Sequence, residues 1–301
     1  MGIRHLQACA QVVGAAQVVV ALRDSRDEAM LAGLPLGSQV DRAAWSPDFG
    51  KDCDLVVVAV QTELHAQVAA EIAAPRLIEK PLCQSPEQAI AVLAQPWRTF
   101  VGHSSRAEAG AVALHRALQT GAIGEVRHIS VDCRESQLLR PAAGRPQQVG
   151  RLFDVAVHAL ATVADALPAQ PPSEVWAELV AGHGDLLLLR GKLQWASGPS
   201  LTVQIQPDRD SGRQVRVEGG AATLNWLVAP GRSELLRILD GVTAALPCGG
   251  PPSQLVLLGA VLDAIASGQP SPFAGAHGLR VLQWTGQLLA AAGPFEWEWV
   301  R

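Results

Sequence analysis

The sequence feature that most constrains the fold is an unbroken run of apolar, mostly β-branched residues, Leu-Val-Val-Val-Ala-Val, over 55–60. A strand with apolar side chains at every position has to be covered on both faces, which is typical of parallel sheets. Shorter apolar segments alternate with segments of helical pattern, at 16–22, 62–73, 76–78, 86–95 and 98–102. This β-α-β-α order predicts a doubly wound α/β sheet in the first third of the chain.

The pattern changes after residue 126, where short segments of alternating apolar and polar residues replace the buried runs. Alternation indicates strands with one face covered, as in an open, mostly antiparallel sheet. Strands are predicted at 126–133, 175–180, 186–189, 201–205, 215–217 and 222–227, and helices at 107–119, 154–167, 254–266 and 279–292. The stretch 140–150 is rich in Pro, Gly and Gln and is predicted to be a mobile loop near a site. The fold class is therefore an α/β parallel sheet followed by an α+β domain.

Composition excludes several classes of function. The net charge is −4 and no basic run of five or more residues occurs, so we expect no nucleic-acid partner. The apolar runs are shorter than the ~18 residues that a membrane helix needs, and no secretory pattern is present, so we expect a cytoplasmic protein without a membrane partner. The five cysteines are widely spaced, which argues against a metal site or a disulfide framework. The absence of tyrosine excludes a tyrosine acid.

The tripeptide Glu79-Lys80-Pro81 is the first group that could carry chemistry. It follows a predicted parallel strand, and ligands in open α/β sheets bind at that carboxyl edge. Pro81 restricts Lys80 to extended geometry and can hold a cis peptide bond that aims the ammonium group. The alternative reading of the same residues is an ordinary surface turn.

Asp154 and His158 are the second group. They are four residues apart on a predicted helix and therefore share a face. Their neighbours are apolar, so two ionisable side chains there need partners or a cleft. The alternative is that Asp154 lies near the helix start, where a carboxylate suits the dipole, and that His158 is a hydrogen-bonded core histidine.

A series of motifs follows in order along nearly the whole chain. Residues 54–65 precede Glu-Lys-Pro-Leu at 79–82, Val-Gly-His-Ser-Ser-Arg at 101–106, Gly-Ala-Ile-Gly-Glu-Val at 121–126, Gly150-x-x-x-Asp154-x-x-x-His158, and Ala-Ile-Ala-Ser-Gly at 264–268. This ordered set resembles the glucose–fructose oxidoreductase, inositol dehydrogenase and MocA family.

The resemblance implies a Rossmann-like, dinucleotide-binding domain over 1–106 and a substrate and oligomerisation domain with an open antiparallel sheet over 107–301. It implies hydride transfer between NAD or NADP and a sugar, a polyol or a related hydroxy or carbonyl compound. His158 would act as acid/base on the substrate oxygen, and Lys80 would hydrogen-bond that oxygen and the nicotinamide ribose. Asp154 would position substrate hydroxyls or His158.

The resemblance also implies which residues contact the cofactor, namely Gly2, Ile3, Arg23, Asp24, Val60, Gln61, His65, Glu79 and Lys80. Arg106 and Arg134 could supply charge for a phosphate or carboxylate of a small-molecule substrate, or could sit in salt bridges. No metal is expected. Association through the open sheet face into a homodimer or homotetramer is expected.

The first departure from the family pattern is the dinucleotide fingerprint, a strand and Gly-x-Gly-x-x-Gly that open a helix. The chain begins Met-Gly-Ile-Arg-His-Leu, which is similar to the end of that fingerprint without its first strand and first two glycines. One explanation is a misassigned start codon with about ten residues missing upstream. The other is a real loss of the usual dinucleotide site. We favour the first.

The second departure lies at Leu22-Arg23-Asp24, where the family often places an acidic residue for the adenosine ribose. Arg23 can bind a 2′-phosphate, so the sequence leans towards NADP, although Asp24 could still serve the ribose. The alternative is that Arg23 and Asp24 form only a solvated turn. A second acid soon after His158, frequent in the family, is also missing here. The alternative function is therefore a cofactor-less family member that acts as a binding or scaffolding protein.

Overall fold

The computed structural model describes residues 2–22, 25–46, 49–181, 186–196 and 198–300 and divides the chain into two compact units. Unit 1 comprises Met1–Gly102 and Pro252–Gly278, and unit 2 comprises His103–Pro251 and Leu279–Arg301. The boundary near residue 106 was expected, but the return of 252–278 to unit 1 was not. Helix α7 (Ser253–Ser267) packs against α1 (Gly2–Val13), and the Val101 amide donates to the Phe273 carbonyl at 2.8 Å. Such distant pairing leaves no local sequence pattern.

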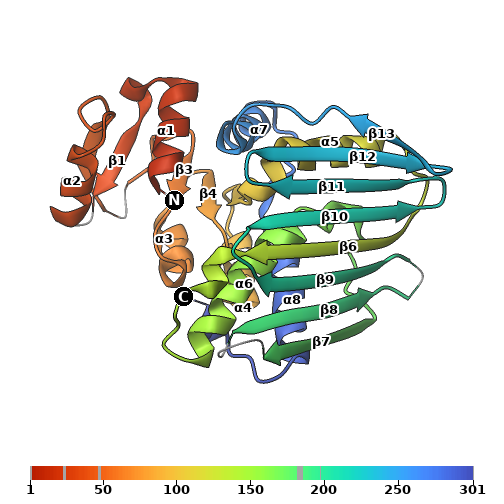
Figure 1. The fold of residues 1–301 in the computed structure, drawn as a ribbon. Helices are drawn as coiled ribbons and strands as arrows, with labels where there is room; N and C mark the ends of the chain where they lie inside the picture. The colour runs from red at the N-terminus through yellow and green to blue at the C-terminus, as the bar shows by residue number, and fades with distance from the viewer. Residues whose placement is uncertain (1, 23–24, 47–48, 182–185, 197, 301) are drawn as a thin grey trace. The chain divides into compact units, whose positions relative to one another are not determined.

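The described strands of unit 1 form two parallel sheets, β1 with β2, and β3-β4-β5. Figure 1 labels β1, β3 and β4 of these strands. The remaining elements of this unit are β1 (Val19–Leu22), α2 (Ser25–Ala32), β2 (Asp41–Ala44), β3 (Val56–Val58), α3 (His65–Glu71), β4 (Arg76–Glu79), α4 (Pro86–Leu93) and β5 (Thr99–Gly102). The predicted parallel α/β sheet is confirmed. The Ser85 hydroxyl caps α4 by accepting from the Gln88 amide at 3.4 Å, and Pro86 opens the first turn.

A buried arginine ties the helices of unit 1 to its three-stranded sheet. Arg76 is 0% exposed. Its guanidinium donates to the carbonyls of Ala69 (2.6 Å), Ile72 (3.3 Å) and Val92 (2.9 Å), at the carboxyl ends of α3 and α4, and to the Thr99 hydroxyl (3.0 Å). Helix carboxyl ends carry partial negative charge, so the cation suits this position. Burial lowers the pKa of Arg76.

The described strands of unit 2 form one sheet in the order β13-β12-β11-β10-β6-β9-β8-β7, antiparallel except for β6 beside β9. The strands are β6 (Val126–Glu135), β7 (Glu174–Ala181), β8 (Leu187–Gln194), β9 (Ser200–Pro207), β10 (Gly212–Gly219), β11 (Thr223–Ala229), β12 (Arg232–Leu239) and β13 (Val242–Leu246). The predicted open, mostly antiparallel sheet is confirmed, but β12 and β13 were not predicted. Charged residues interrupt β12, and β13 is an exposed edge without an alternating pattern.

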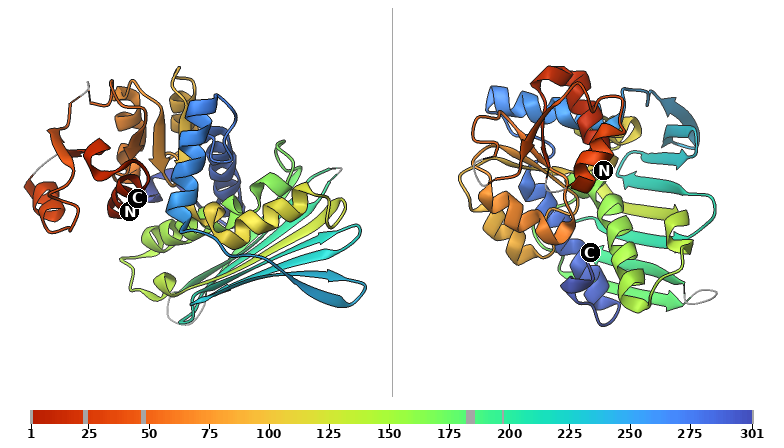
Figure 2. Two further views of the ribbon diagram at one scale, coloured as in Figure 1. Left: turned by 90° about the horizontal axis from the view of Figure 1, so that it is seen from above. Right: turned by 90° about the vertical axis from the view of Figure 1, so that its left-hand side faces the viewer.

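The helices α5 (Ala109–Gln119) and α6 (Arg145–Ala161) and the last part of α8 (Gly275–Ala291) lie on one face of this sheet, as Figure 2 shows. The core lies between them and includes Ile129 and Val131 of β6 and Leu224 and Trp226 of β11. No described helix of unit 2 covers the opposite face, which carries mainly polar side chains such as Ser130, Thr202 and Asn225.

Helix α6 corrects two expectations. It begins at Arg145 instead of about Asp154, so the second half of the predicted mobile loop is helical. The reason is Pro146, because proline is common in loops but also suits the first turn of a helix. Gly150 is needed inside this helix, because a Cβ there would lie 2.4 Å from the Trp299 carbonyl oxygen. Asp154 is therefore a mid-helix residue, and the proposed pairing of its carboxylate with the helix start does not apply.

Candidate functional site

Lys80 follows β4 at the carboxyl edge of the three-stranded parallel sheet, and its side chain is half-buried. The Lys80–Pro81 peptide bond is cis, as the motif allowed. The backbone of Lys80 is held on both sides. Its amide donates to Glu79 Oε2 at 3.0 Å, and the Pro81 carbonyl meets Nδ1 of His65 at 2.9 Å.

Glu79 is 4% exposed, and both of its carboxylate oxygens are engaged inside unit 1. Oε1 lies 2.5 Å from Nε2 of His5 on α1, and Oε2 accepts from the Lys80 amide. Burial by itself would raise the pKa of Glu79, but the hydrogen bonds and positive charges of His5 and Lys80 hold it below its ordinary value. These contacts let Glu79 position the Lys80 turn, and its predicted contact with the cofactor stays a prediction. His5 was not singled out from the sequence.

His65, at the start of α3, is also buried and directed at the backbone. Its Nε2 lies 3.2 Å from the Val60 carbonyl, and its Nδ1 faces Pro81. Burial lowers its pKa, although the carbonyl oxygens around the ring oppose that shift. A neutral ring has one N–H, so it donates to one of the two carbonyls. His65 thus joins the ends of β3 and β4 and positions the Lys80 turn.

Other predicted cofactor residues lie near the same strand ends. Gly2 and Ile3 begin α1, and a Cβ on Gly2 would stand 3.7 Å from the Ala59 Cβ, so this helix starts beside the end of β3. Gln61 is exposed just beyond that strand, next to half-buried Val60. Arg23 and Asp24 lie outside the described residues.

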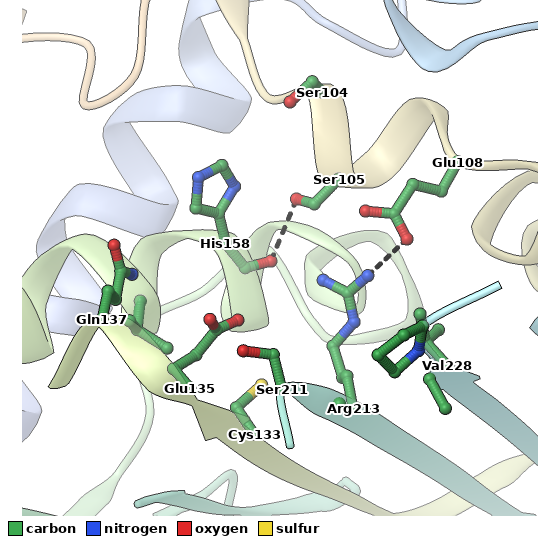
Figure 3. A pocket seen from close by; sticks show the side chains of 14 residues that line it. Ser104, Ser105, Glu108, Cys133, Glu135, Gln137, His158, Ser211, Arg213 and Val228 are labelled. Carbon is green, nitrogen blue, oxygen red and sulfur yellow. Dashed lines mark hydrogen bonds and ion pairs between the residues drawn. The ribbon is translucent and has the colours of Figure 1, made fainter. Parts of the chain in front are cut away.

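A cavity of about 390 Å³ opens in unit 2 between the first turn after β5 and the ends of β6 and β10 (Figure 3). It is lined by Ser104, Ser105, Glu108, Cys133, Glu135, Gln137, Val155, His158, Ser211, Gly212, Arg213, Val228, Ala229 and Pro230. His158 is the one predicted catalytic residue among these. Its backbone carbonyl accepts a hydrogen bond from the Ser105 hydroxyl at 3.1 Å, and in Figure 3 its ring lies on the Ser104 side of the backbone.

Asp154 and His158 share one face of α6, as predicted from their spacing. Between 152 and 161 they are the two side chains that are not buried. Asp154 acts on the cavity through its charge, since it contributes to a raised pKa of Glu135. The structure thus places the predicted pair on one face of α6 and brings His158, but not Asp154, into the cavity lining.

Three charged residues at the cavity were missed from the sequence: Glu135, Glu108 and Arg213. Burial raises the pKa of Glu135, the charge of Arg213 opposes that shift, and the charge of Asp154 adds to it. Arg213 donates to Glu108 Oε2 at 2.5 Å and lies over the Trp226 ring, 4.8 Å from its centroid. Strand alternation could have identified two of them. Glu135 is two residues after buried Cys133, and Arg213 is two residues before buried Val215, so each lies on the buried face of its strand.

The two arginines predicted as substrate contacts are not among the residues that line the cavity. Arg134 is exposed and points to the opposite face of β6 from Glu135, on the side of Gly212, whose Cβ would be 3.8 Å from Arg134 Nη2. Arg106 is buried and forms an ion pair with Asp165, which also faces Arg280 at 3.5 Å. Burial and then the charge of Arg280 lower the pKa of Arg106 to about 10. Arg106 therefore lies in a salt bridge, which is the alternative given for it above.

Among the described residues, no group of three or more His, Cys, Asp or Glu side chains is arranged to hold a metal ion. A search of the same residues finds no helix with the length and apolar character needed to cross a membrane.

The chain combines a parallel α/β unit with an open, mostly antiparallel sheet that has helices on one face. Solved structures with this fold match the chain. UDP-N-acetylglucosamine 3-dehydrogenase GnnA from Acidithiobacillus ferrooxidans is 20% identical, with a TM-score of 0.80 over 97% of this chain and 94% of that chain. Levoglucosan dehydrogenase in complex with NADH and levoglucosan is 18% identical, with a TM-score of 0.76 over 96% and 93%.

An oxidoreductase from Agrobacterium radiobacter, in complex with NAD⁺, L-tartaric acid and magnesium, is 16% identical, with a TM-score of 0.76 over 97% and 93%. No family model and no curated protein matches the sequence. The matching structures are oxidoreductases of the glucose–fructose oxidoreductase, inositol dehydrogenase and MocA type, so the resemblance found in the sequence is confirmed at the level of the fold.

Proposed function

We propose that this protein is an oxidoreductase that transfers hydride between a nicotinamide dinucleotide and a sugar, a polyol or a related hydroxy or carbonyl compound. The observation that carries the proposal is His158, half-buried on α6 with Asp154 one turn away, in the wall of a cavity large enough for a monosaccharide. Support comes from the likeness to solved dehydrogenases. The alternative, a binding or scaffolding protein without a cofactor, has no support among these likenesses.

His158, Asp154 and Lys80 are proposed to have different roles in the reaction. His158 accepts the proton of the substrate hydroxyl during oxidation and returns it during reduction, because an imidazole titrates near neutral pH. Asp154, on the same helix face, orients substrate hydroxyls or stabilises protonated His158. The Lys80 ammonium donates a hydrogen bond to the reacting oxygen and stabilises negative charge that develops there.

The residues present fit a nicotinamide dinucleotide at the carboxyl edge of unit 1. Lys80 stands at the end of β4 and Gln61 beyond the end of β3, and both strand ends face the same edge. Gly2 and Ile3 add the start of α1 beside that edge, where backbone amides suit a pyrophosphate. The bound cofactor would supply or accept the hydride. We propose NADP as the preferred form because of Arg23.

A substrate screen tests the proposal. The protein would be mixed with NADPH or NADH, or with the oxidised forms, and with a panel of monosaccharides, cyclic polyols and their keto derivatives, and cofactor absorbance would be followed. We expect turnover with at least one pair, and tighter binding of NADPH than of NADH in a fluorescence titration. No absorbance change with any pair would refute the oxidoreductase proposal, and tighter NADH binding would refute the NADP assignment.

We also propose that copies of the chain associate through the uncovered face of the eight-stranded sheet into a homodimer or homotetramer. This face carries neighbouring side chains that could pair between copies, among them Ser130, Asp132 and Gln204. Light scattering should give a mass of two or four chains. A single-chain mass at micromolar concentration would contradict this.

A further inference from the structure

The wall of the cavity beneath His158 is formed by Glu135, the last residue of β6. Its carboxylate points up into the cavity in Figure 3. The strand fixes this direction, because Val131, Cys133 and Glu135 alternate onto the face that the helices cover, and the first two are buried core residues. Glu135 is thus a half-buried acid that lines the same cavity as His158.

The one arginine among the cavity-lining residues has its charge compensated. Arg213 bonds to Glu108 at 2.5 Å, its side chain is 12% exposed, and it stacks on Trp226. The Trp226 ring is itself fixed by a bond from its Nε1 to the Ser233 hydroxyl at 3.0 Å. An arginine held on both sides in this way is not free to turn and clamp an anion.

The formal charge of the cavity follows from these groups. The lining includes two carboxylates, Glu108 and Glu135, and one guanidinium, Arg213, which leaves one net negative charge with His158 neutral. The charge of Asp154 also reaches Glu135. The other polar lining residues near Glu135 are uncharged, such as Gln137 and Ser211. An ionised carboxylate only accepts hydrogen bonds, so Glu135 favours ligand groups that donate hydrogen bonds and repels anionic groups.

We infer that Glu135 is a specificity-determining residue that accepts hydrogen bonds from hydroxyl or ammonium groups of the substrate, and that it excludes sugars bearing a carboxylate or phosphate at that wall. The inference rests on the proposed function and deepens it: the substrate class is an uncharged or amino-bearing polyhydroxylated ring. It assigns the recognition of substrate charge to Glu135, on the inner face of β6, in place of Arg134 on the outer face.

The test measures binding of three probes that share a pyranose ring: D-glucose, D-glucosamine and D-glucuronate. Dissociation constants are obtained by ligand-observed NMR at low ionic strength and neutral pH. The wild-type protein is compared with Glu135→Gln, which keeps the shape and removes the charge, and with Glu135→Asp, which keeps the charge. Glu218→Gln is the matched control, because it makes the same change on the outer face of β10. Melting curves confirm that each variant folds.

We expect D-glucuronate to bind the wild-type protein at least about tenfold more weakly than D-glucose, a difference of about 1.4 kcal/mol. Glu135→Gln should bring the two within about threefold and weaken D-glucosamine binding, since the electrostatic discrimination is then lost. Glu135→Asp and Glu218→Gln should keep the wild-type ratio.

Three results would overturn the inference: D-glucuronate binding as tightly as D-glucose to the wild type, a ratio unchanged in Glu135→Gln, or no binding of any of the three probes. Turnover is scored separately by cofactor absorbance. If the expected binding ratios appear without any hydride transfer, the proposed function fails while the role of Glu135 in selecting ligands stands.

Discussion

Replacing Arg76 with methionine should destabilise unit 1 by an amount that the structure allows one to estimate. Methionine fills a similar volume without donors, so the carbonyls of Ala69, Ile72 and Val92 lose the guanidinium. The Ala69 carbonyl keeps a bond from the Ile72 amide at 3.4 Å, and that of Val92 keeps one from the Gln95 amide at 3.3 Å. These two carbonyls therefore lose only part of their hydrogen bonding.

A buried acceptor left without its partner costs about 1–3 kcal/mol, and each weakened bond costs about 1 kcal/mol more. Removing a buried charge offsets part of that cost, because ions are expensive to desolvate. We therefore expect Arg76→Met to lower the free energy of unfolding of unit 1 by about 2–4 kcal/mol.

Hydrogen exchange is the suitable assay, since a chain with two compact units need not unfold in one step. Amides of β3, β4 and β5 should exchange about 30- to 700-fold faster in Arg76→Met, which is the same free energy written as a ratio. Arg4→Met, on the exposed face of α1, is the control and should change stability by less than about 0.5 kcal/mol. Exchange in the Arg76 variant no faster than in the control would refute the reasoning.

Three further predictions concern single side chains. His158→Asn should lower kcat/KM by about 10²- to 10⁴-fold, whereas His128→Asn, on the outer sheet face, should not; equal rates for both would remove His158 from the mechanism. The pKa of Glu79 in the folded protein lies below its ordinary value, so its contribution to stability is present above that ordinary pKa and is lost as pH falls through the folded pKa. Glu79→Gln should therefore lose less stability in acid than the wild type. An unchanged dependence of the unfolding free energy on acid pH, measured by denaturant titration, would contradict this. Gly110→Ala would place a Cβ 2.0 Å from Trp226 Nε1 and should cost about 1–3 kcal/mol in unit 2, unlike Gly259→Ala, which meets nothing within 4 Å; equal melting temperatures would show that the Trp226 ring can move.

The fold could be predicted to the extent that it is written in local patterns. The apolar run at 55–60 and the capped helix after Ser85 identified the parallel sheet, and alternation identified most of the open sheet. What failed was structure set by distant contacts. The return of 252–278 to unit 1 depends on its packing against α1 and its bonding to the backbone of β5, which no local pattern encodes. Strand β12 carries Arg232 and Glu234, whose mutual ion pair makes charge acceptable in a strand.

Site residues could be predicted from the sequence where their spacing along one helix places them. They could not be predicted where their position depends on strand direction or on a distant ion-pair partner. The four-residue spacing of Asp154 and His158 was enough to place them on one face of α6. The choice between Arg134 and Glu135 depended on which of two neighbouring residues faces inward, and a predicted strand that stopped at residue 133 left this open. Arg106 was ambiguous because its partner, Asp165, is distant in sequence and can be recognised only in the folded chain.

The burial of the ionisable side chains distinguishes Lys80 and His158 from the structural arginines Arg76 and Arg106. Arg76 and Arg106 are held through their side chains, which are buried and spent on carbonyls or on a carboxylate. The main chain around Lys80 and His158 is held as well, the first by Glu79 at its amide and by His65 at the neighbouring Pro81 carbonyl, and the second by Ser105 at its own carbonyl. Their side chains remain half-buried. A reactive group needs a fixed origin and an accessible tip, because rate depends on placing it accurately while it still reaches the substrate. An anchored main chain and a half-buried side chain suit Lys80 and His158 to this role, whereas Arg76 and Arg106 are buried.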